Sequence, residues 1–108
     1  FKSYEELTIP KRAKNSNHVF HQYTLQLSDK IDRDELVSFL SQKNIPAMVY
    51  YPVPAHKQKM FSTLEIACGN LDNTNWLTSR VISLPMHTEL SYEQQKYIVE
   101  SIKEFINK

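Results

Sequence analysis

Two phenols and an imidazole lie close together in the segment 50–56, which reads YYPVPAH. Aromatic rings can stack on a ligand, and hydroxyl and imidazole groups can form hydrogen bonds with a sugar or a phosphate. Pro52 and Pro54 impose an extended path, because each lacks an N–H and restricts the residue before it. The segment is therefore a candidate ligand-binding loop. The alternative is that these residues are core aromatic side chains at the end of a strand.

The four histidines do not have the spacing of a metal site. His18 and His21 are three residues apart on a predicted strand, so their side chains point to opposite faces. His56 and His87 lie in separate predicted turns. We therefore expect no metal site.

The sequence does not indicate nucleophilic or acid–base catalysis. Cys68, the only cysteine, has no base or cation close to it in the sequence, and we interpret it as a small, partly buried side chain. It can form no internal disulfide, which suits a reducing compartment such as the cytoplasm. The carboxylates fall at predicted helix starts or on outer helix faces: Asp32, Asp34, Glu35, Glu93, Glu100 and Glu104. We expect no catalytic residue in this chain.

The 108 residues give room for one domain, and their formal net charge is +1. A charge this small would not gather nucleic acid or an anionic membrane, and no apolar run approaches the roughly 20 residues of a spanning helix. The single glycine, Gly69, excludes the glycine-rich loops that bind phosphates or dinucleotides. The chain begins at Phe1 without a signal-peptide pattern, and we interpret it as part of a longer protein.

The first predicted strand follows a polar beginning. Residues 1–17 carry four basic side chains and little periodic apolar content, so we expect a solvated lead-in before a domain over residues 18–108. Residues 18–27 alternate in polarity, which predicts a half-buried strand. One face of this strand would carry Val19, His21, Tyr23, Leu25 and Leu27.

A helix is predicted from residue 33 onward because its start signals are complete: a cap, a capping-box partner and both halves of a hydrophobic staple. These residues are Asp32, Glu35, Ile31 and Leu36. Asn44 suits the left-handed position that follows a helix end. Residues 47–51 then predict a second strand, which the two prolines of the YYPVPAH segment end.

The second half of the chain predicts more helix than strand. Residues 56–61 predict one or two helical turns, and residues 62–70 predict a loop. A helix capped by Asp72 follows, and residues 82–84 predict a third strand. Ser91 and Gln94 have capping-box spacing before a C-terminal helix. Its inner stripe would be Gln95, Ile98, Val99, Ile102, Phe105 and Ile106. The alternation of predicted strands and helices along the chain predicts an α/β sandwich, in which helices pack on one face of a small three-stranded sheet.

Five short motifs, taken together, carry a family resemblance over nearly the whole chain. In order they are HVFHQY at 18–23, RDEL at 33–36, IP at 45–46, YPVPAH at 51–56 and SLPMH at 83–87, followed by EL at 89–90. The sequence resembles the C-terminal part of the sugar aminotransferases of the DegT/DnrJ/EryC1/StrS group. These are pyridoxal-phosphate enzymes that aminate nucleotide-linked keto sugars in amino-sugar or cell-surface polysaccharide biosynthesis.

The resemblance implies an aspartate aminotransferase fold (fold type I), of which this chain would be the small C-terminal domain. Its partners would be the large pyridoxal-phosphate-binding domain of the same chain, a second subunit in a homodimer and a nucleotide-sugar substrate, with no nucleic acid and no membrane. The catalytic lysine and the aspartate under the pyridine nitrogen belong to the large domain. Lys57 and Lys59 match no family lysine motif, so we expect the chain alone to be inactive and to bind no cofactor.

The resemblance also implies substrate-binding residues. Tyr51 and His56 would face the sugar-nucleotide cleft, and His21, Tyr23 and Tyr50 are weaker candidates. Tyr50 stands where the family often has histidine. An apolar patch that the large domain would cover is expected from Tyr50, Tyr51, Val53, Pro54, Met60, Phe61 and Met86.

Two alternatives to the aminotransferase interpretation remain open. The first is a free-standing α/β ligand-binding or regulatory module. The second is an RNA-binding module on a small sheet, which would need exposed aromatic residues at set strand positions and basic surroundings.

Overall fold

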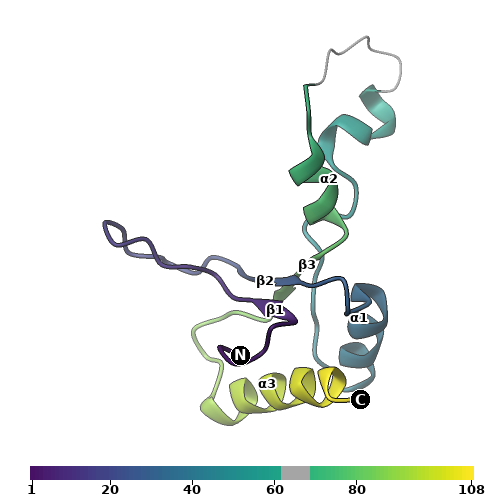
Figure 1. Cartoon of the computed structure of the whole chain (residues 1–108). Helices are drawn as coiled ribbons and strands as arrows, with labels where there is room; N and C mark the ends of the chain where they lie inside the picture. Colours follow the sequence, from purple (N-terminus) through teal and green to yellow (C-terminus); the bar gives the residue numbers. More distant parts are fainter. Residues whose placement is uncertain (62–68) are drawn as a thin grey trace.

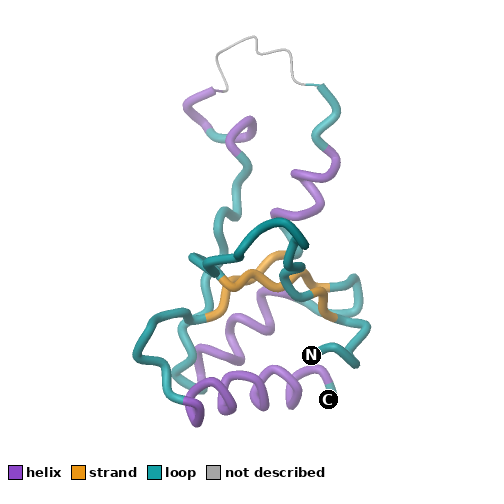
Figure 2. Tube along the Cα trace, turned by 90° about the vertical axis from the view of Figure 1, so that its left-hand side faces the viewer, coloured by secondary structure: helices purple, strands orange, loops and turns teal. Residues whose placement is uncertain are grey.

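The computed structural model describes residues 1–61 and 69–108. Its sheet is antiparallel, with strands in the order β1 (Leu7–Thr8), β2 (Tyr23–Leu27) and β3 (Val81–Leu84). Helices α1 (Arg33–Gln42) and α3 (Tyr92–Ile106) lie on one side of this sheet (Figure 2). The predicted fold class, three strands with helices packed on one face, is confirmed.

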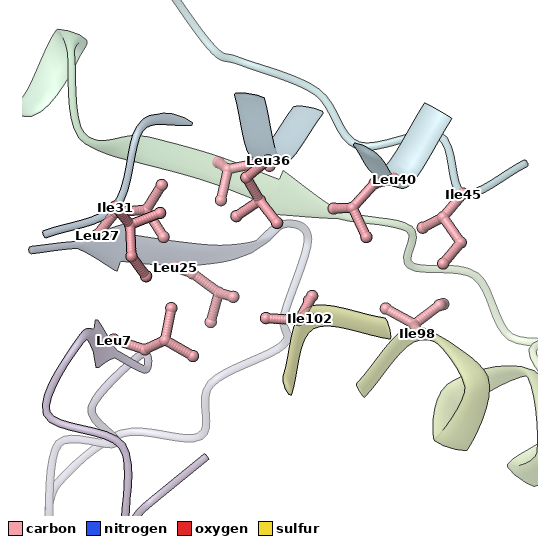
Figure 3. Packing of buried hydrophobic residues seen from close by; sticks show 10 residues of the cluster. Leu7, Leu25, Leu27, Ile31, Leu36, Leu40, Ile45, Ile98 and Ile102 are labelled. Carbon is pink, nitrogen blue, oxygen red and sulfur yellow. The ribbon is translucent and has the colours of Figure 1, made fainter. Parts of the chain in front are cut away.

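The core lies between the sheet and these two helices (Figure 3). Strand residues alternate between faces, so Leu25 and Leu27 both point toward the helices and are almost fully buried. Leu25 pairs with Ile82 across the β2–β3 ladder, and Ile82 is also fully buried. The helices contribute three further residues whose side chains are wholly buried: Leu36, Leu40 and Ile102.

Helix α1 begins and ends where its local signals predict. The Oδ1 of Asp32 accepts hydrogen bonds from the backbone N–H groups of Asp34, at 2.8 Å, and Glu35, at 2.9 Å. Asn44 adopts the left-handed conformation after the helix, with φ of 57°. The N–H of Ile45 then returns to the carbonyl of Leu40 at 2.9 Å, which closes the helix end.

Helix α3 has the predicted capping box. The hydroxyl of Ser91 accepts from the N–H of Gln94 at 3.2 Å, and the side chain of Gln94 accepts from the N–H of Ser91 at 2.8 Å. Ile98 and Ile102 are buried as expected. Gln95 is instead exposed, and its amide donates to the carbonyl of Leu90 at 3.0 Å. Placing Gln95 on the inner stripe was therefore wrong, because a polar side chain at the helix start finds its hydrogen bond outside the core.

Two legs of the chain, residues 49–61 and 69–78, leave the sheet on the same side (Figure 1). We call these two legs the arm. The outgoing leg contains two 3₁₀ turns, η1 (Ala55–Lys57) and η2 (Lys59–Phe61), which confirms the prediction of one or two helical turns. The returning leg contains α2 (Asp72–Thr78). The N–H of Asp72 donates to the side chain of Asn70 at 2.9 Å, so Asp72 is not the cap that we expected.

Two of the predicted strands are wrong in extent. The strand expected over 18–27 begins only at Tyr23, because Phe20 has a positive φ of 49° and breaks the extended path. Val19 is consequently 86% exposed. The strand expected over 47–51 is a single bridge, with Met48 paired to Ser83 through bonds of 2.9 and 2.7 Å. Prolines close to this segment prevent a longer ladder.

The edge strand β1 comes from residues 1–17, the segment that was expected to be a solvated lead-in. Leu7 pairs with Leu27 and is only 7% exposed, so β1 adds an edge to the sheet and a side chain to the core. Two residues are too few to show a periodic pattern, which is why the sequence did not indicate this strand. The expectations for Cys68 and for most of the 62–70 loop fall outside the described residues. None of the helices in the described ranges is long and apolar enough to cross a membrane.

Candidate functional site

Residues 84–86, where the chain leaves β3, line two neighbouring hollows. One hollow, of about 220 Å³, is lined by His21 and Tyr50, and we call it the Tyr50 hollow. The other, of about 330 Å³, is lined by Tyr23 and is called the Tyr23 hollow. The structure therefore brings three of the five predicted substrate-binding residues to the same end of the sheet.

The walls of the two hollows differ in character. Around the Tyr50 hollow, Gln22 and Ser83 add polar groups beside the imidazole and the phenol. The Tyr23 hollow is mainly apolar, because its wall includes Phe1 and one side of α3, and it has a second imidazole from His87. Rings with polar tips next to apolar walls are typical of small-molecule sites.

Tyr51 and His56 lie on the arm and line neither of these two hollows. The ring of Tyr51 is 71% exposed and packs edge-to-face against the ring of Tyr50, with centroids 5.8 Å apart. His56 is half-buried in η1. Tyr51 is thus connected to the Tyr50 hollow through one ring contact, whereas His56 stands further along the arm. The alternative of a core aromatic residue does not fit Tyr51.

A stack of rings beside Tyr23 was not predicted from the sequence. His18 stacks on Phe20 with centroids 4.2 Å apart, and Phe20 stacks on Tyr23 at 5.7 Å. The guanidinium of Arg12 lies 4.9 Å from the centre of the Phe20 ring. The alternation of residues 18–27 had placed Phe20 and Tyr23 on opposite faces. The positive φ of Phe20 interrupts that alternation, and the Phe20 ring lies against the Tyr23 ring.

The ion pairs that shift pKa values lie on the helix side of the sheet. A hydrogen bond from Lys43 lowers the pKa of Glu104, and the same contact, of 2.9 Å, raises the pKa of Lys43. The pKa of Glu93 is lowered by its backbone N–H and by Ser91 at the start of α3. These groups join and cap the helices. None of them lines the Tyr50 hollow or the Tyr23 hollow.

The described residues do not fit a pyridoxal-phosphate pocket. Such a pocket needs a lysine amine directed into a closed site and a cradle for the phosphate. Lys57 and Lys59 are exposed on the 3₁₀ turns, and Lys43 and Lys103 pair with glutamates of α3. The remaining lysines of the chain are exposed. Within residues 1–61 and 69–108, no group of three or more metal-binding side chains comes together.

The fold defines the class of protein. The structure superposes on that of a DegT DnrJ EryC1 StrS aminotransferase from Brucella abortus with a TM-score of 0.82 and 31% identity. The match covers 95% of this chain and 27% of the other. DesV from S. venezuelae, solved in complex with a ketimine intermediate, matches with a TM-score of 0.83 and 25% identity, over 95% of this chain and 27% of that one. The chain therefore has the fold of one part of these aminotransferases.

The sequence agrees with the fold. The model of the DegT/DnrJ/EryC1/StrS aminotransferase family matches residues 1–103, so the chain belongs to this family. A pleiotropic regulatory protein of Geobacillus stearothermophilus is 45% identical over 99 residues, 92% of this chain and 26% of that protein. The UDP-N-acetyl-3-dehydro-alpha-D-glucosamine 3-aminotransferase of Acidithiobacillus ferrooxidans is 37% identical over 91% of this chain and 25% of that enzyme. The chain spans about a quarter of the length of these relatives.

Proposed function

We propose that this chain is the C-terminal small domain of a pyridoxal-phosphate-dependent aminotransferase that aminates a nucleotide-linked keto sugar. The observation that carries the proposal is the family match over residues 1–103 by a chain that spans about a quarter of its relatives. Such a reaction belongs to amino-sugar or cell-surface polysaccharide biosynthesis in the cytoplasm. By itself the chain would be inactive, because its lysines fit no cofactor pocket.

The names of the relatives support a nucleotide sugar as the substrate class. One relative is named as the 3-aminotransferase of a UDP-linked 3-dehydro sugar, and another, from Shigella dysenteriae and 34% identical, is a dTDP-4-amino-4,6-dideoxy-D-glucose transaminase. They differ in nucleotide and in the position of the amine. We therefore infer the class of substrate for this chain and not the individual sugar.

In this proposal the chain's own residues bind and orient the sugar. Pyridoxal phosphate, held by a large domain of the same protein in a homodimer, would supply the electron sink for amino transfer. Tyr51 and Tyr50 offer a hydroxyl donor each, and His21 offers an imidazole at the Tyr50 hollow. Pro52 and Pro54 keep the arm extended, so less entropy is lost when a ligand binds.

A regulatory module is the second candidate. It is favoured by one observation, the name of the 45% identical Geobacillus relative. The two candidates differ in what the complete protein does with a keto sugar, since a regulator need not aminate it.

The test is to express the complete reading frame that contains this chain and to offer it glutamate with UDP-, dTDP- and GDP-linked keto sugars. The aminotransferase proposal expects a bound cofactor, conversion of glutamate to 2-oxoglutarate and an equal amount of amino sugar, measured by mass spectrometry. Bound cofactor with no amino transfer to any of the three sugar classes would overturn it in favour of the regulatory candidate.

A further inference from the structure

Ser83 lies on the face of the sheet that looks away from α1 and α3 (Figure 2). Leu25 and Ile82 are paired and point toward the helices, so the next pair along the ladder, Thr24 and Ser83, points to the opposite face. Met48 pairs with Ser83 from the other side, through backbone hydrogen bonds of 2.9 and 2.7 Å. Ser83 is therefore the middle residue of a row of three, of which Ser83 and Met48 line the Tyr50 hollow.

Ser83 brings a buried hydroxyl group to the wall of this hollow. The residue is only 4% exposed, and its Oγ lies 2.8 Å from Oγ1 of Thr24. A hydroxyl has one proton and two lone pairs, so whichever oxygen donates in this pair, the Ser83 hydroxyl keeps capacity for another hydrogen bond. Among the described residues, Thr24 is the one hydrogen-bond partner of this hydroxyl. A ligand in the hollow can therefore take up the capacity that remains.

The polar groups around the Tyr50 hollow suit an uncharged ligand. Beside the Ser83 hydroxyl, the wall has the amide of Gln22, the phenol of Tyr50 and the imidazole of His21. Within the part of the chain that the structure describes, no lysine, arginine, aspartate or glutamate lines this hollow. A diphosphate is bound best by charged donors, and a nucleobase has polar atoms only along the edge of its ring. Four neutral polar side chains around about 220 Å³ fit a sugar ring better, because its hydroxyl groups project on every side.

We propose that Ser83 is a specificity-determining residue, whose hydroxyl forms a hydrogen bond with an oxygen of the sugar ring held in the Tyr50 hollow. The proposal rests on the proposed function for its ligand, a nucleotide-linked sugar. The diphosphate and the base lie outside the hollow. A sugar without an oxygen at the contacted position leaves the buried hydroxyl of Ser83 short of a partner, so the hollow selects against that sugar.

The test measures, by calorimetry, how the complete protein binds UDP-, dTDP- and GDP-glucose and the three matching free diphosphates. Ser83→Ala should weaken binding of the glucose-linked nucleotide roughly three- to tenfold, because one neutral hydrogen bond is lost, and should leave the affinity for the free diphosphate unchanged. Thr24→Val is the matched control. It removes the same hydroxyl pair but keeps the hydroxyl of Ser83, and Thr24 does not line the hollow. Both affinities should therefore stay at the wild-type value in Thr24→Val.

Three results would overturn the proposal. Unchanged binding of the glucose-linked nucleotide in Ser83→Ala would show that this hydroxyl does not contact the sugar. Equal losses in Ser83→Ala and Thr24→Val would show that the hydroxyl pair acts only by holding β2 against β3. Equal losses for the glucose-linked nucleotide and the free diphosphate would show that the hollow takes the nucleotide half of the ligand. If Ser83→Ala does not fold, Ser83→Cys, whose thiol is a weak hydrogen-bonding group, decides by the same comparison.

Free glucose separates this proposal from the proposed function. A complete protein that binds none of the three nucleotides would contradict the proposed function. The hollow is then tested with free glucose by saturation-transfer NMR. Transfer that is present in the wild type and lost in Ser83→Ala would support sugar binding at Ser83, and a wild-type protein that shows no transfer would overturn it.

Discussion

Tyr51 is the exposed ring on which the proposed site depends most. Its ring packs against the ring of Tyr50, which lines the Tyr50 hollow, and Pro52 stiffens the backbone after it. In the complete enzyme, Tyr51→Phe should raise the KM for the keto sugar roughly three- to twentyfold, because one hydrogen bond to the substrate is lost. The half-reaction with the amino donor should stay nearly unchanged.

A melting curve of the same variant provides the control. A ring that is 71% exposed contributes little packing, so the melting temperature should stay close to that of the wild type. Normal sugar kinetics in Tyr51→Phe would remove Tyr51 from the site.

Glu104 makes stability depend on pH. The hydrogen bond from Lys43 lowers its pKa from the ordinary value of 4.5, so the folded chain holds this proton less tightly than the unfolded chain. The stabilisation that this hydrogen bond gives is complete above the pKa of Glu104 in the unfolded chain. It is lost as the pH falls through the pKa of Glu104 in the folded chain. We expect Glu104→Gln to melt below the wild type at neutral pH, with the difference closing in acid.

Melting curves between pH 7 and about pH 3 would measure this effect. Glu5→Gln, an exposed substitution before β1, is the matched control and should follow the wild type. A difference for Glu104→Gln that grows as the pH falls would contradict the prediction.

At the scale of the element, the start of α1 depends on one carboxylate. Asp32 accepts two backbone hydrogen bonds that have no partner within the helix. Asp32→Ala should therefore lower the free energy of unfolding by about 1 kcal/mol in urea denaturation. Asp32→Asn keeps an acceptor oxygen and should restore most of the loss. Equal losses in both variants would show that charge, and not the cap, is what matters there.

The whole chain exposes apolar side chains on and around the arm. Seven residues were predicted to form an exposed apolar patch. Most of them are exposed, as predicted: Tyr50, Tyr51, Val53, Met60 and Met86. Pro54 and Phe61 are half-buried. In a complete enzyme we expect the large domain to cover this surface, and in the chain alone we expect it to drive self-association.

Sedimentation of the 108-residue chain would show this association as a mass that rises with concentration. The double substitution Val53→Glu with Met60→Glu should restore the monomer. Val19→Glu is the control, because Val19 is 86% exposed but lies on the β1–β2 connection. A wild-type chain that stays monomeric at every concentration would argue against an adhesive patch.

The chain alone should not bind the cofactor of its family. Its lysines are exposed or paired with glutamates, so no amine is directed into a closed site. Absorbance titration with pyridoxal phosphate should therefore show no saturable complex. Borohydride trapping at one defined lysine would contradict this prediction.

Local signals in the sequence determined the helices and the centre of the sheet. Asp32 and Ser91 hydrogen-bond to groups only two or three residues away, so their roles can be read from short windows. The alternation that buries Leu25 and Leu27 is equally local. The motifs at 18–23 and 51–56 indicated the family for the same reason, since a motif is a local pattern.

Tertiary structure alone decided which segments meet. The pairing of Leu7 with Leu27 depends on a loop that turns through Phe20, and the contact of Arg33 with Thr78 joins residues 45 apart in the chain. Neither has a periodic or capping signal, because each depends on where a distant backbone lies. The same cause separates the predicted site residues, with His21 and Tyr50 at one hollow, Tyr23 at another and His56 out on the arm.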